Sequence, residues 1–417
     1  MQPTYYNRFG YRPPRKRGIK SIIATFSTAV GLLAYTSTVL LWPLQTLQAE
    51  PTVINQQPVE EVAIEWPEYG QSAVYAQGYG TLGTNGSDKA VPMASITKIV
   101  TALTVLEKRP LAKGSEGASI TFTDADVKTY DAYLSRLGSV APVTPGKNIT
   151  QRDTLDVMLG ISANNYADKM AIWAFGSLDA YLVAANQYLA DHNLHDTKVA
   201  DASGFSPKSR STASDLVRLG SLALAEPAIA TAVNSRKVAV PGYGTVNNTS
   251  RLLQQDNEVI GIKTGTTDEA GSCLLYAKKF MVDGQELVII GATLGAPNHI
   301  RLAADAAKVL ASIRNGFETT TIAAKGTPFA TYDTPWGETI RAVAANEVRG
   351  LTWKGGKPTP GISVDDMGFR DLPVKIGAVV FTQGQQTVAT ASLELESPAA
   401  GPDWLWRIAH PGTVFGL

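Results

Sequence analysis

The sequence contains little cysteine and histidine and carries no net charge. Among 417 residues there are one cysteine, Cys273, and four histidines, so no intrachain disulfide and no thiolate metal cluster can form. The 37 basic and 37 acidic residues balance, which argues against nucleic acid or another polyanion as a partner. His192 and His195 are the only histidines close in sequence, and we place them on a solvated loop. We therefore predict no metal site and no cofactor.

The composition otherwise fits a folded protein with one apolar run of membrane length. With 44% hydrophobic residues, the chain can fill a large domain and a smaller one. The segment 21–42 is uncharged, and the next basic residue after it is Lys89. The basic residues before it are Arg8, Arg12, Arg15, Lys16, Arg17 and Lys20. By the positive-inside rule, residues 1–20 stay in the cytoplasm and the chain beyond the run is exported.

Two interpretations of the apolar run remain open. Its length, about 33 Å as a helix, is enough to cross the hydrocarbon core of a bilayer, which favours an uncleaved anchor and a single-pass membrane protein. A cleavable signal peptide usually has a shorter apolar stretch of about 7 to 15 residues, although Leu47-Gln48-Ala49 fits a cleavage site. The segment 43–60 is polar, contains proline and shows no period, so we predict a linker that holds the folded part away from the membrane.

A serine and a lysine three residues apart stand at the start of an apolar helical stretch. Ser95 and Lys98 should share one face, one turn apart, at a helix N-terminus. The apolar positions that predict the helix are Ile96, Ile99, Val100, Leu103 and Leu106. Lys98 can act as the base for the Ser95 hydroxyl only where burial or a nearby positive charge lowers its pKa. Taken alone, Ser-x-x-Lys is frequent in helices whose serine and lysine are merely solvated.

A second polar motif lies between two predicted helices. Leu155 to Gly160 reads as the end of one helix, and the next begins after Asn164. The turn between them is Ile161-Ser162-Ala163-Asn164-Asn165. Polar side chains in such a turn are often helix caps, so Ser162 and Asn164 have a purely structural alternative.

A third motif follows a short apolar strand. Residues 259–262 lead into Lys263-Thr264-Gly265-Thr266. Two apolar runs, 272–280 and 286–294, are joined across Asp283-Gly284, which is a strong hairpin signal. Lys263 should therefore lie on a strand of an antiparallel sheet. Upstream, the alternating segment 72–82 predicts another strand, and Gly83-Thr84-Asn85-Gly86 after it predicts a turn.

The order of these elements predicts two folded units. Strands on both sides of a long helical middle indicate an α/β domain from about 61 to 316, with a sheet, flanking helices and an all-helical region. Short β-rich runs separated by Gly and Pro predict a small all-β domain over 319–396. The tail 397–417 carries Trp404 and Trp406, which suit either packing on the β domain or a membrane interface.

The three motifs together resemble one enzyme family. Ser95-Ile96-Thr97-Lys98, Ser162-Ala163-Asn164 and Lys263-Thr264-Gly265 form the pattern of penicillin-binding proteins and serine β-lactamases, with Ala163 where an aspartate is common. With Asp201-Ala202-Ser203-Gly204-Phe205 and the residues after Gly265, the sequence is similar to the D-alanyl-D-alanine carboxypeptidases, the low-molecular-mass penicillin-binding proteins. This resemblance covers about residues 61–316 and implies a β-lactamase/transpeptidase-like fold.

The resemblance implies a role for each catalytic residue. Ser95 would attack the carbonyl of the terminal D-Ala-D-Ala bond of a peptidoglycan stem peptide and form an acyl-enzyme, and Lys98 would accept its proton. Ser162 would relay a proton to the leaving D-alanine, and Asn164 would hold Lys98 and the substrate amide. β-Lactams would acylate Ser95 as mimics of the dipeptide.

The third motif would bind the end of the substrate. In the resemblance, Lys263 and Thr264 hold the terminal carboxylate, and Gly265 lets the strand approach the peptide. The backbone N–H groups of Ser95 and Thr266 would form the oxyanion hole. The enzyme would then work at the outer face of the cell membrane, in cell-wall metabolism.

Three alternatives stay open. A D,D-endopeptidase would use the same residues on a cross-link. A class A β-lactamase needs a glutamate to activate the deacylating water, and no glutamate lies between Asn164 and Glu226. A non-catalytic β-lactam sensor or wall-binding protein predicts erosion of at least one motif, yet all three are intact.

Overall fold

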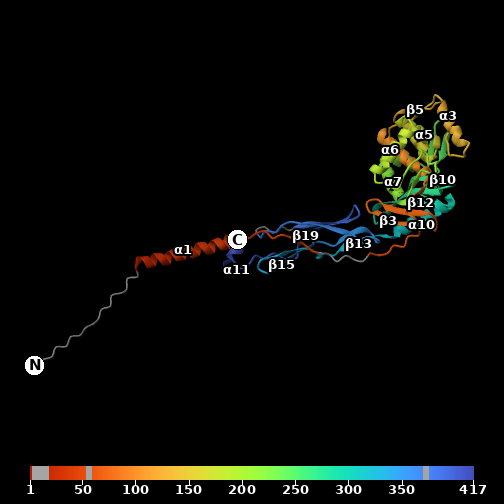
Figure 1. The fold of residues 1–417 in the computed structure, drawn as a ribbon. Coiled ribbons are helices and arrows are strands. Elements are labelled where there is room, and N and C mark those ends of the chain that lie inside the picture. Colours follow the sequence, from red (N-terminus) through yellow and green to blue (C-terminus); the bar gives the residue numbers. More distant parts are fainter. Residues whose placement is uncertain (2–17, 53–58, 370–374) are drawn as a thin grey trace.

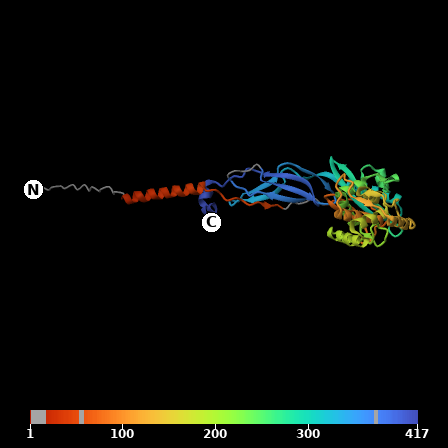
Figure 2. The ribbon, with the colours of Figure 1, turned by 90° about the horizontal axis from the view of Figure 1, so that it is seen from above.

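The computed structural model describes residues 1, 18–52, 59–369 and 375–417. The protein is elongated, with the helix α1 near one end, a β-rich part in the middle and the α/β domain at the far end (Figures 1 and 2). The predicted cytoplasmic tail, residues 1–20, falls almost entirely outside the described residues. The predicted class, an α/β domain followed by a β domain, agrees with this arrangement.

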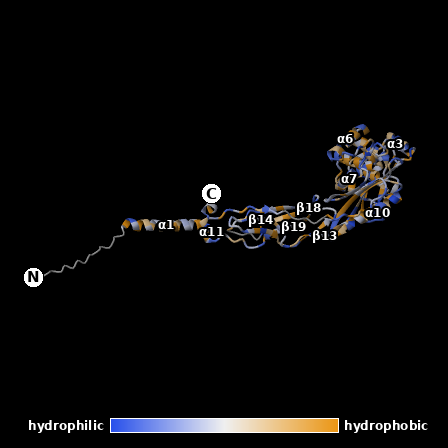
Figure 3. Cartoon of the chain, turned by 60° about the horizontal axis from the view of Figure 1, so that its bottom comes forward, coloured by the Kyte–Doolittle hydropathy of each residue, from blue (hydrophilic) through white to orange (hydrophobic). Residues whose placement is uncertain are grey.

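The N-terminal helix α1, Ile19–Leu41, makes few contacts with the rest of the described structure, and Val39 is its one buried residue. Its 23 residues span about 35 Å, and within the described residues it is the one unbroken helix long and apolar enough to cross a membrane. Figure 3 shows that it projects away from the folded domains. A membrane anchor and a signal sequence both fit such a helix.

A five-stranded antiparallel sheet forms the base of the α/β domain, in the order β10-β11-β12-β2-β3. The strands are β2 Gln71–Ala76, β3 Gly80–Gly86, β10 Val259–Thr267, β11 Gly271–Val282 and β12 Gln285–Ala296. The predicted hairpin is confirmed: Val282 pairs with Gln285, and both turn residues have positive φ, as the tight turn requires. The turn predicted at residues 83–86 is wrong, because those residues pair with β2 and belong to β3.

Helices cover both faces of this sheet. On one face lie α7 (Ala213–Ala225) and α8 (Pro227–Asn234), and on the other lies α10 (His299–Asn315). The start of α7 is capped by the Thr212 side chain, and that of α10 by Asn298, as expected for these residue types. The sheet is thus buried between two apolar clusters.

A helical region packs against the α7 side of the sheet and holds the first two motifs. Its helices are α2 Thr97–Lys108, α3 Asp124–Leu134, α4 Gln151–Gly160, α5 Asn164–Phe175 and α6 Leu178–Asp191. The predicted break between two helices is confirmed, but it is shorter than the predicted turn 161–165, because α5 already begins at Asn164. The smaller elements of the domain are η1 Ala94–Ile96, β4 Val91–Pro92, β5 Ser119–Thr121, β6 Asn148–Thr150, β7 Arg210–Ser211, β8 Lys237–Val240, β9 Gly244–Asn247 and α9 Arg251–Gln255.

The C-terminal part consists of a six-stranded sheet, β1-β14-β15-β19-β18-β17, and the pair β13-β16. Its strands are β1 Glu50–Pro51, β13 Phe317–Ala323, β14 Pro328–Asp333, β15 Thr339–Ala344, β16 Val348–Trp353, β17 Thr359–Val364, β18 Gly377–Gln383 and β19 Gln386–Leu395. Part of the predicted linker over 43–60 is paired with the β domain, and its residues 53–58 lie outside the described residues. Glu50 and Pro51 pair with β14, and Leu47 bridges Met367, because the edge of β14 offers unpaired backbone groups.

The two parts share a contact at the β2–β3 turn. The Tyr79 ring packs edge-on against Phe317 with centroids 5.0 Å apart, and its hydroxyl donates to the Leu351 carbonyl at 3.0 Å. Trp353 continues the same apolar cluster. The β domain is therefore packed against the sheet at the end away from α3 (Figure 1).

The C-terminal tail folds back onto the exit of α1. It forms α11 (Trp404–Ala409) and α12 (Pro411–Phe415). The Arg407 guanidinium donates to the carbonyls of Leu40 at 2.9 Å and Trp42 at 3.0 Å, which are among the acceptors that a helix end leaves unsatisfied. Trp406 packs on Trp336 of the β domain, with ring centroids 5.7 Å apart. The tail thus contacts both the β domain and α1.

Candidate active site

The first motif sits where the chain turns from a short 3₁₀ segment into α2. Ser95 lies within η1, and Lys98 lies one turn later in α2. Ala94 has φ of +47°, an uncommon conformation for a residue with a side chain, and such positions cluster at functional sites. Ile96, at the end of η1, and Ile99, in α2, are both fully buried. The apolar side of α2 therefore holds the serine rigidly at the domain surface.

Lys98 is completely buried and makes three hydrogen bonds through Nζ. It lies 2.8 Å from Ser95 Oγ, 2.7 Å from Asn164 Oδ1 and 2.7 Å from the Ser203 carbonyl oxygen. A neutral amine has two N–H donors and one lone pair. Asn164 and Ser203 can take the two donors, which leaves the lone pair facing the Ser95 hydroxyl. This is the geometry of a nucleophile and its general base.

The surroundings favour the neutral amine. Burial lowers the pKa of Lys98 well below 10.5, and the charge of Lys263 lowers it further, while Asp201 and Asp168 oppose the shift. A lysine becomes a useful base only after such a shift. In the structure, both burial and a nearby positive charge lower the pKa of Lys98, as its role as a base requires.

The Ser203 carbonyl is held in place by a tightly bonded loop. Asp201 accepts hydrogen bonds from the backbone N–H of Phe205 at 2.7 Å and from the Ser203 hydroxyl at 3.0 Å. Gly204 has φ of +74°, and a Cβ there would lie 1.8 Å from the Ala94 carbonyl oxygen. This loop thus packs directly against the turn that carries Ser95. We assign Asp201 a positioning role, which the sequence resemblance did not specify.

The second motif is brought to the same place by the turn between α4 and α5. Asn164 is 3% exposed and bonds Lys98, and its backbone N–H donates to the Ser139 carbonyl at 2.8 Å. Ser162 adopts a left-handed conformation with φ of +67°. The residue is 5% exposed, and its hydroxyl has no hydrogen-bond partner within the part of the chain that the structure describes. The structure joins Asn164 to the Ser95–Lys98 pair and leaves Ser162 without a direct bond to it.

The third motif provides a buried cation without a carboxylate partner. Lys263 is 1% exposed, and its Nζ donates only to the Thr264 carbonyl at 3.1 Å among the described residues. Burial lowers its pKa to about 7. A buried lysine without an anion is costly, and Lys263 lies near enough to Lys98 to lower the pKa of that amine. Thr264 shares a hydrogen bond of 2.9 Å with the hydroxyl of Thr249.

Gly265 brings β10 against the nucleophile. A Cβ at this position would lie 2.8 Å from the Ser95 backbone nitrogen and 3.0 Å from Cβ of Ala94. Any side chain would push the strand away from η1 and open the gap between them. The glycine therefore sets the spacing between the serine and the strand, in addition to the approach to substrate that the sequence suggested.

His299 is a residue of the site that sequence reasoning missed. Its Nε2 lies 2.7 Å from Oγ1 of Thr266, at the first position of α10. Burial lowers its pKa, and the charges of Lys263 and Arg251 lower it further. His299 and Thr266 are 33 positions apart in the sequence, so no short sequence motif predicts their contact. It adds a titratable group beside the strand that carries Lys263.

Replacing His299 by glutamine should reduce the loss of folding stability that occurs as the pH falls. In the native protein the histidine pKa is lowered, so as pH falls through about 6.5 the unfolded chain takes up the proton first and stability is lost. Glutamine keeps an amide within reach of Thr266 and cannot titrate. Urea unfolding at pH 7.5 and 5.5 should show a smaller loss for the variant than for wild type. An equal loss would show that His299 does not titrate in this environment.

Comparison with known proteins agrees with this geometry. A model of the peptidase S11 family, described as D-alanyl-D-alanine carboxypeptidase, matches residues 77–297, which include all three motifs. The chain belongs to this family and is a low-molecular-mass penicillin-binding protein, a serine-type D-Ala-D-Ala peptidase of the cell wall.

Some relatives of this chain are named as D-alanyl-D-alanine endopeptidases and others as carboxypeptidases. It is 30% identical over 231 residues to a D-alanyl-D-alanine endopeptidase of Pseudomonas aeruginosa, which covers 54% of this chain and 71% of that protein. It is 30% identical over 193 residues to the D-alanyl-D-alanine carboxypeptidase DacB2 of Mycobacterium tuberculosis, covering 44% of this chain and 62% of the relative. The crystal structure of carboxypeptidase DacD from Francisella tularensis matches with a TM-score of 0.58 and 18% identity, over 84% of this chain and 98% of that one. That last match shows a common fold.

Proposed function

We propose that this protein is a D-Ala-D-Ala carboxypeptidase that removes the terminal D-alanine from peptidoglycan stem peptides. The observation that carries the proposal is the placement of Lys98 Nζ, whose pKa is lowered by burial, at 2.8 Å from Ser95 Oγ. Ser95 Oγ attacks the carbonyl carbon of the penultimate D-alanine as its proton passes to Lys98 Nζ. The C–N bond then breaks, D-alanine leaves with a proton on its amine, and an ester on Ser95 remains. Water hydrolyses the ester by the reverse use of the same base.

Residues of the three motifs would bind the C-terminal end of the substrate. The buried Lys263, with Thr264, binds the terminal carboxylate, which neutralises the unpaired cation. The backbone N–H groups of Ser95 and Thr266 stabilise the oxyanion, at about 3 kcal/mol per donor. Ser162, whose hydroxyl is free in the described structure, relays the proton to the leaving amine, and Asn164 orients Lys98.

The deciding experiment separates the two activities found among the relatives. A pentapeptide ending in D-Ala-D-Ala and a cross-linked peptide dimer are incubated separately with the full-length protein in detergent, and the products are identified by mass spectrometry. Release of D-alanine from the pentapeptide alone is the expected result. Cleavage of the dimer alone would replace the proposal by an endopeptidase. Inertness towards both, without a penicillin adduct, would favour a sensor or wall-binding protein.

We further propose that α1 is retained as a membrane anchor and that the catalytic domain faces the outside of the membrane. The basic residues before α1 favour this orientation. The tail supports retention: Arg407 caps the end of α1, and the ring of Phe415 lies 5.3 Å from Trp42. Cleavage after Ala49 would remove these contacts. The intact mass of the protein extracted from membranes should include residues 19–41, and a mass that begins after residue 49 would refute retention.

A further inference from the structure

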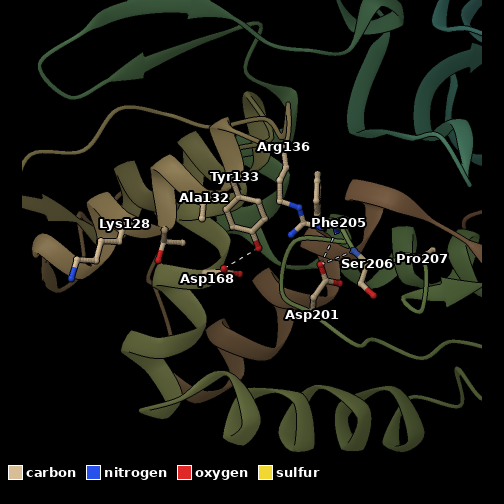
Figure 4. A pocket seen from close by; sticks show the side chains of 10 residues that line it. Lys128, Ala132, Tyr133, Arg136, Asp168, Asp201, Phe205, Ser206 and Pro207 are labelled. Atoms are coloured by element: carbon tan, nitrogen blue, oxygen red, sulfur yellow. Dashed lines mark hydrogen bonds between the residues drawn. The ribbon is translucent and has the colours of Figure 1, made fainter.

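Two buried side chains near Lys98 have no part in the mechanism described so far. Asp168, in α5, is 8% exposed, and Tyr133, in α3, points its hydroxyl at the carboxyl group (Figure 4). The Tyr133 hydroxyl lies 2.9 Å from Oδ2 of Asp168 and is its one hydrogen-bond donor among the described residues. A buried carboxylate with a single donor is costly. The pair is therefore a candidate for a functional role.

A chain of polar contacts joins this pair to Lys98. The Tyr133 hydroxyl lies 3.3 Å from the hydroxyl of Ser203, and the Ser203 carbonyl oxygen accepts a hydrogen bond from Lys98 Nζ at 2.7 Å. The Ser203 hydroxyl also lies 3.0 Å from Oδ2 of Asp201. The residue whose carbonyl orients the amine of Lys98 thus connects, through its hydroxyl, to an acidic side chain on each side.

The number of protons in this chain of contacts depends on the charge of Asp168. Ionised carboxylates only accept hydrogen bonds, and each hydroxyl donates one. With both carboxylates ionised, Tyr133 donates to Asp168 and leaves the 3.3 Å contact between the two hydroxyls without a proton once Ser203 donates to Asp201. With one more proton on Asp168, that carboxyl donates to Tyr133, whose hydroxyl then donates to Ser203. Every contact in the chain is then filled.

Asp168 is the carboxyl that takes up this proton. Burial is the main cause that raises its pKa to about 6. The charge of Asp201 adds to the rise, while the Tyr133 hydrogen bond and the charge of Lys98 oppose it. Tyr133, Asp168 and Asp201 line a cavity of about 540 Å³, through which solvent can exchange the proton.

The charged surroundings of Asp168 single out Lys98 as its partner. Helices α2, α3, α4 and α6 pack on α5, and within the described chain α4 adds no charged group that shifts the pKa of Asp168. The titratable groups that face it are Lys98 from α2, Tyr133 from α3, Tyr181 from α6 and Asp201 from the loop 201–207, with Lys128 and Arg136 on the wall of the cavity. Lys128 and Arg136 are exposed, so water screens their charges. The amine of Lys98 is buried and responds most to the charge of Asp168.

We propose that Asp168 and Tyr133 are positioning residues for Lys98, which keep its amine able to act as a base as the pH falls. An ionised Asp168 favours the protonated amine. When Asp168 takes up a proton, that charge disappears and protonation of the amine becomes less favourable. The filled chain of hydrogen bonds then holds Ser203 beside the amine. This inference rests on the proposed function, because it requires Lys98 to be the base for Ser95.

Asp168→Asn tests the proposal, because asparagine has the shape of the protonated acid, keeps a donor for Tyr133 and carries no charge. The rate of Ser95 acylation by fluorescent penicillin is measured from pH 5 to 9 with the full-length protein in detergent. The fall in rate at acid pH should begin at a lower pH in the variant. We expect the ratio of the rate at pH 6 to that at pH 8 to be about two- to threefold higher than in wild type.

Tyr133→Phe is the second variant. It removes the hydrogen bond that lowers the pKa of Asp168, so the fall in rate should move in the same direction as in Asp168→Asn. The matched control is Asp131→Asn, which removes an exposed carboxylate from α3 and should keep the wild-type pH profile. If Asp168→Asn fails to fold, the direction of the change in Tyr133→Phe decides.

A wild-type pH profile in Asp168→Asn would overturn the proposal. An equal loss of rate at every pH would also overturn it, since that indicates a structural role alone. Asp168→Asn should unfold at the same or a higher urea concentration than wild type at pH 7.5, because a carboxyl whose native pKa is raised loses stability as the pH rises through that pKa. If penicillin failed to acylate the wild-type protein at any pH, the proposed function itself would be refuted, and the role of Asp168 with it.

Discussion

Ser95→Ala is expected to abolish both D-alanine release and the covalent penicillin adduct. The variant removes the atom that forms the ester, and no other hydroxyl lies within hydrogen-bond distance of Lys98 Nζ among the described residues. Loss of a nucleophilic serine lowers kcat by a factor on the order of a million in a related mechanism. Fluorescent-penicillin labelling followed by gel electrophoresis checks the adduct, and a D-alanine assay checks hydrolysis.

A matched control is Ser87→Ala, which removes an exposed hydroxyl that accepts only from the Lys89 backbone. It should label and hydrolyse like the wild-type protein. Ser95→Ala should also unfold at the same urea concentration as the control, because Ser95 contributes one hydrogen bond, to Lys98. If the Ser95→Ala variant still hydrolysed the peptide, the acyl-enzyme mechanism would be refuted, whether or not penicillin labelled the variant.

The second large effect is expected from Lys98→Met. Methionine fills a similar space without the amine, so the base for Ser95 is lost and acylation should slow by a factor of about 10² to 10⁴. Penicillin acylation, followed by stopped-flow or quenched labelling, measures this step directly. Lys108→Met, on an exposed position at the end of the same helix, is the control and should acylate at the wild-type rate.

The Lys98→Met substitution should not lower the folding stability of the protein, although it slows acylation. The pKa of Lys98 is lowered in the native state, so below about pH 10.4 the unfolded chain binds a proton that the native state resists. This difference costs stability at neutral pH, and methionine removes the cost. Lys98→Met should therefore unfold at the same or a higher urea concentration than wild type at pH 7. A strongly destabilised variant would show that the Lys98 hydrogen bonds to Asn164 and Ser203 outweigh the burial of the amine.

The pieces that depend on local sequence could be predicted. The helix after Ser95, the break between α4 and α5 and the β11–β12 hairpin follow from apolar periodicity and turn residues over a few positions. The same rules failed where a distant partner decided the outcome. Glu50 and Pro51 pair with β14 nearly three hundred residues away.

The sequence by itself determined the chemistry of this protein: a serine with a lysine one turn later, an interhelical Ser-x-Asn and a strand that ends in Lys-Thr-Gly. Only the tertiary structure decided whether that chemistry is available. The burial that lowers the Lys98 pKa and the Ser203 carbonyl that orients its amine come from segments far apart in the chain. The same holds for His299 beside Thr266. Burial and electrostatic fields depend on what the whole fold packs around a group, and no short stretch of sequence encodes them.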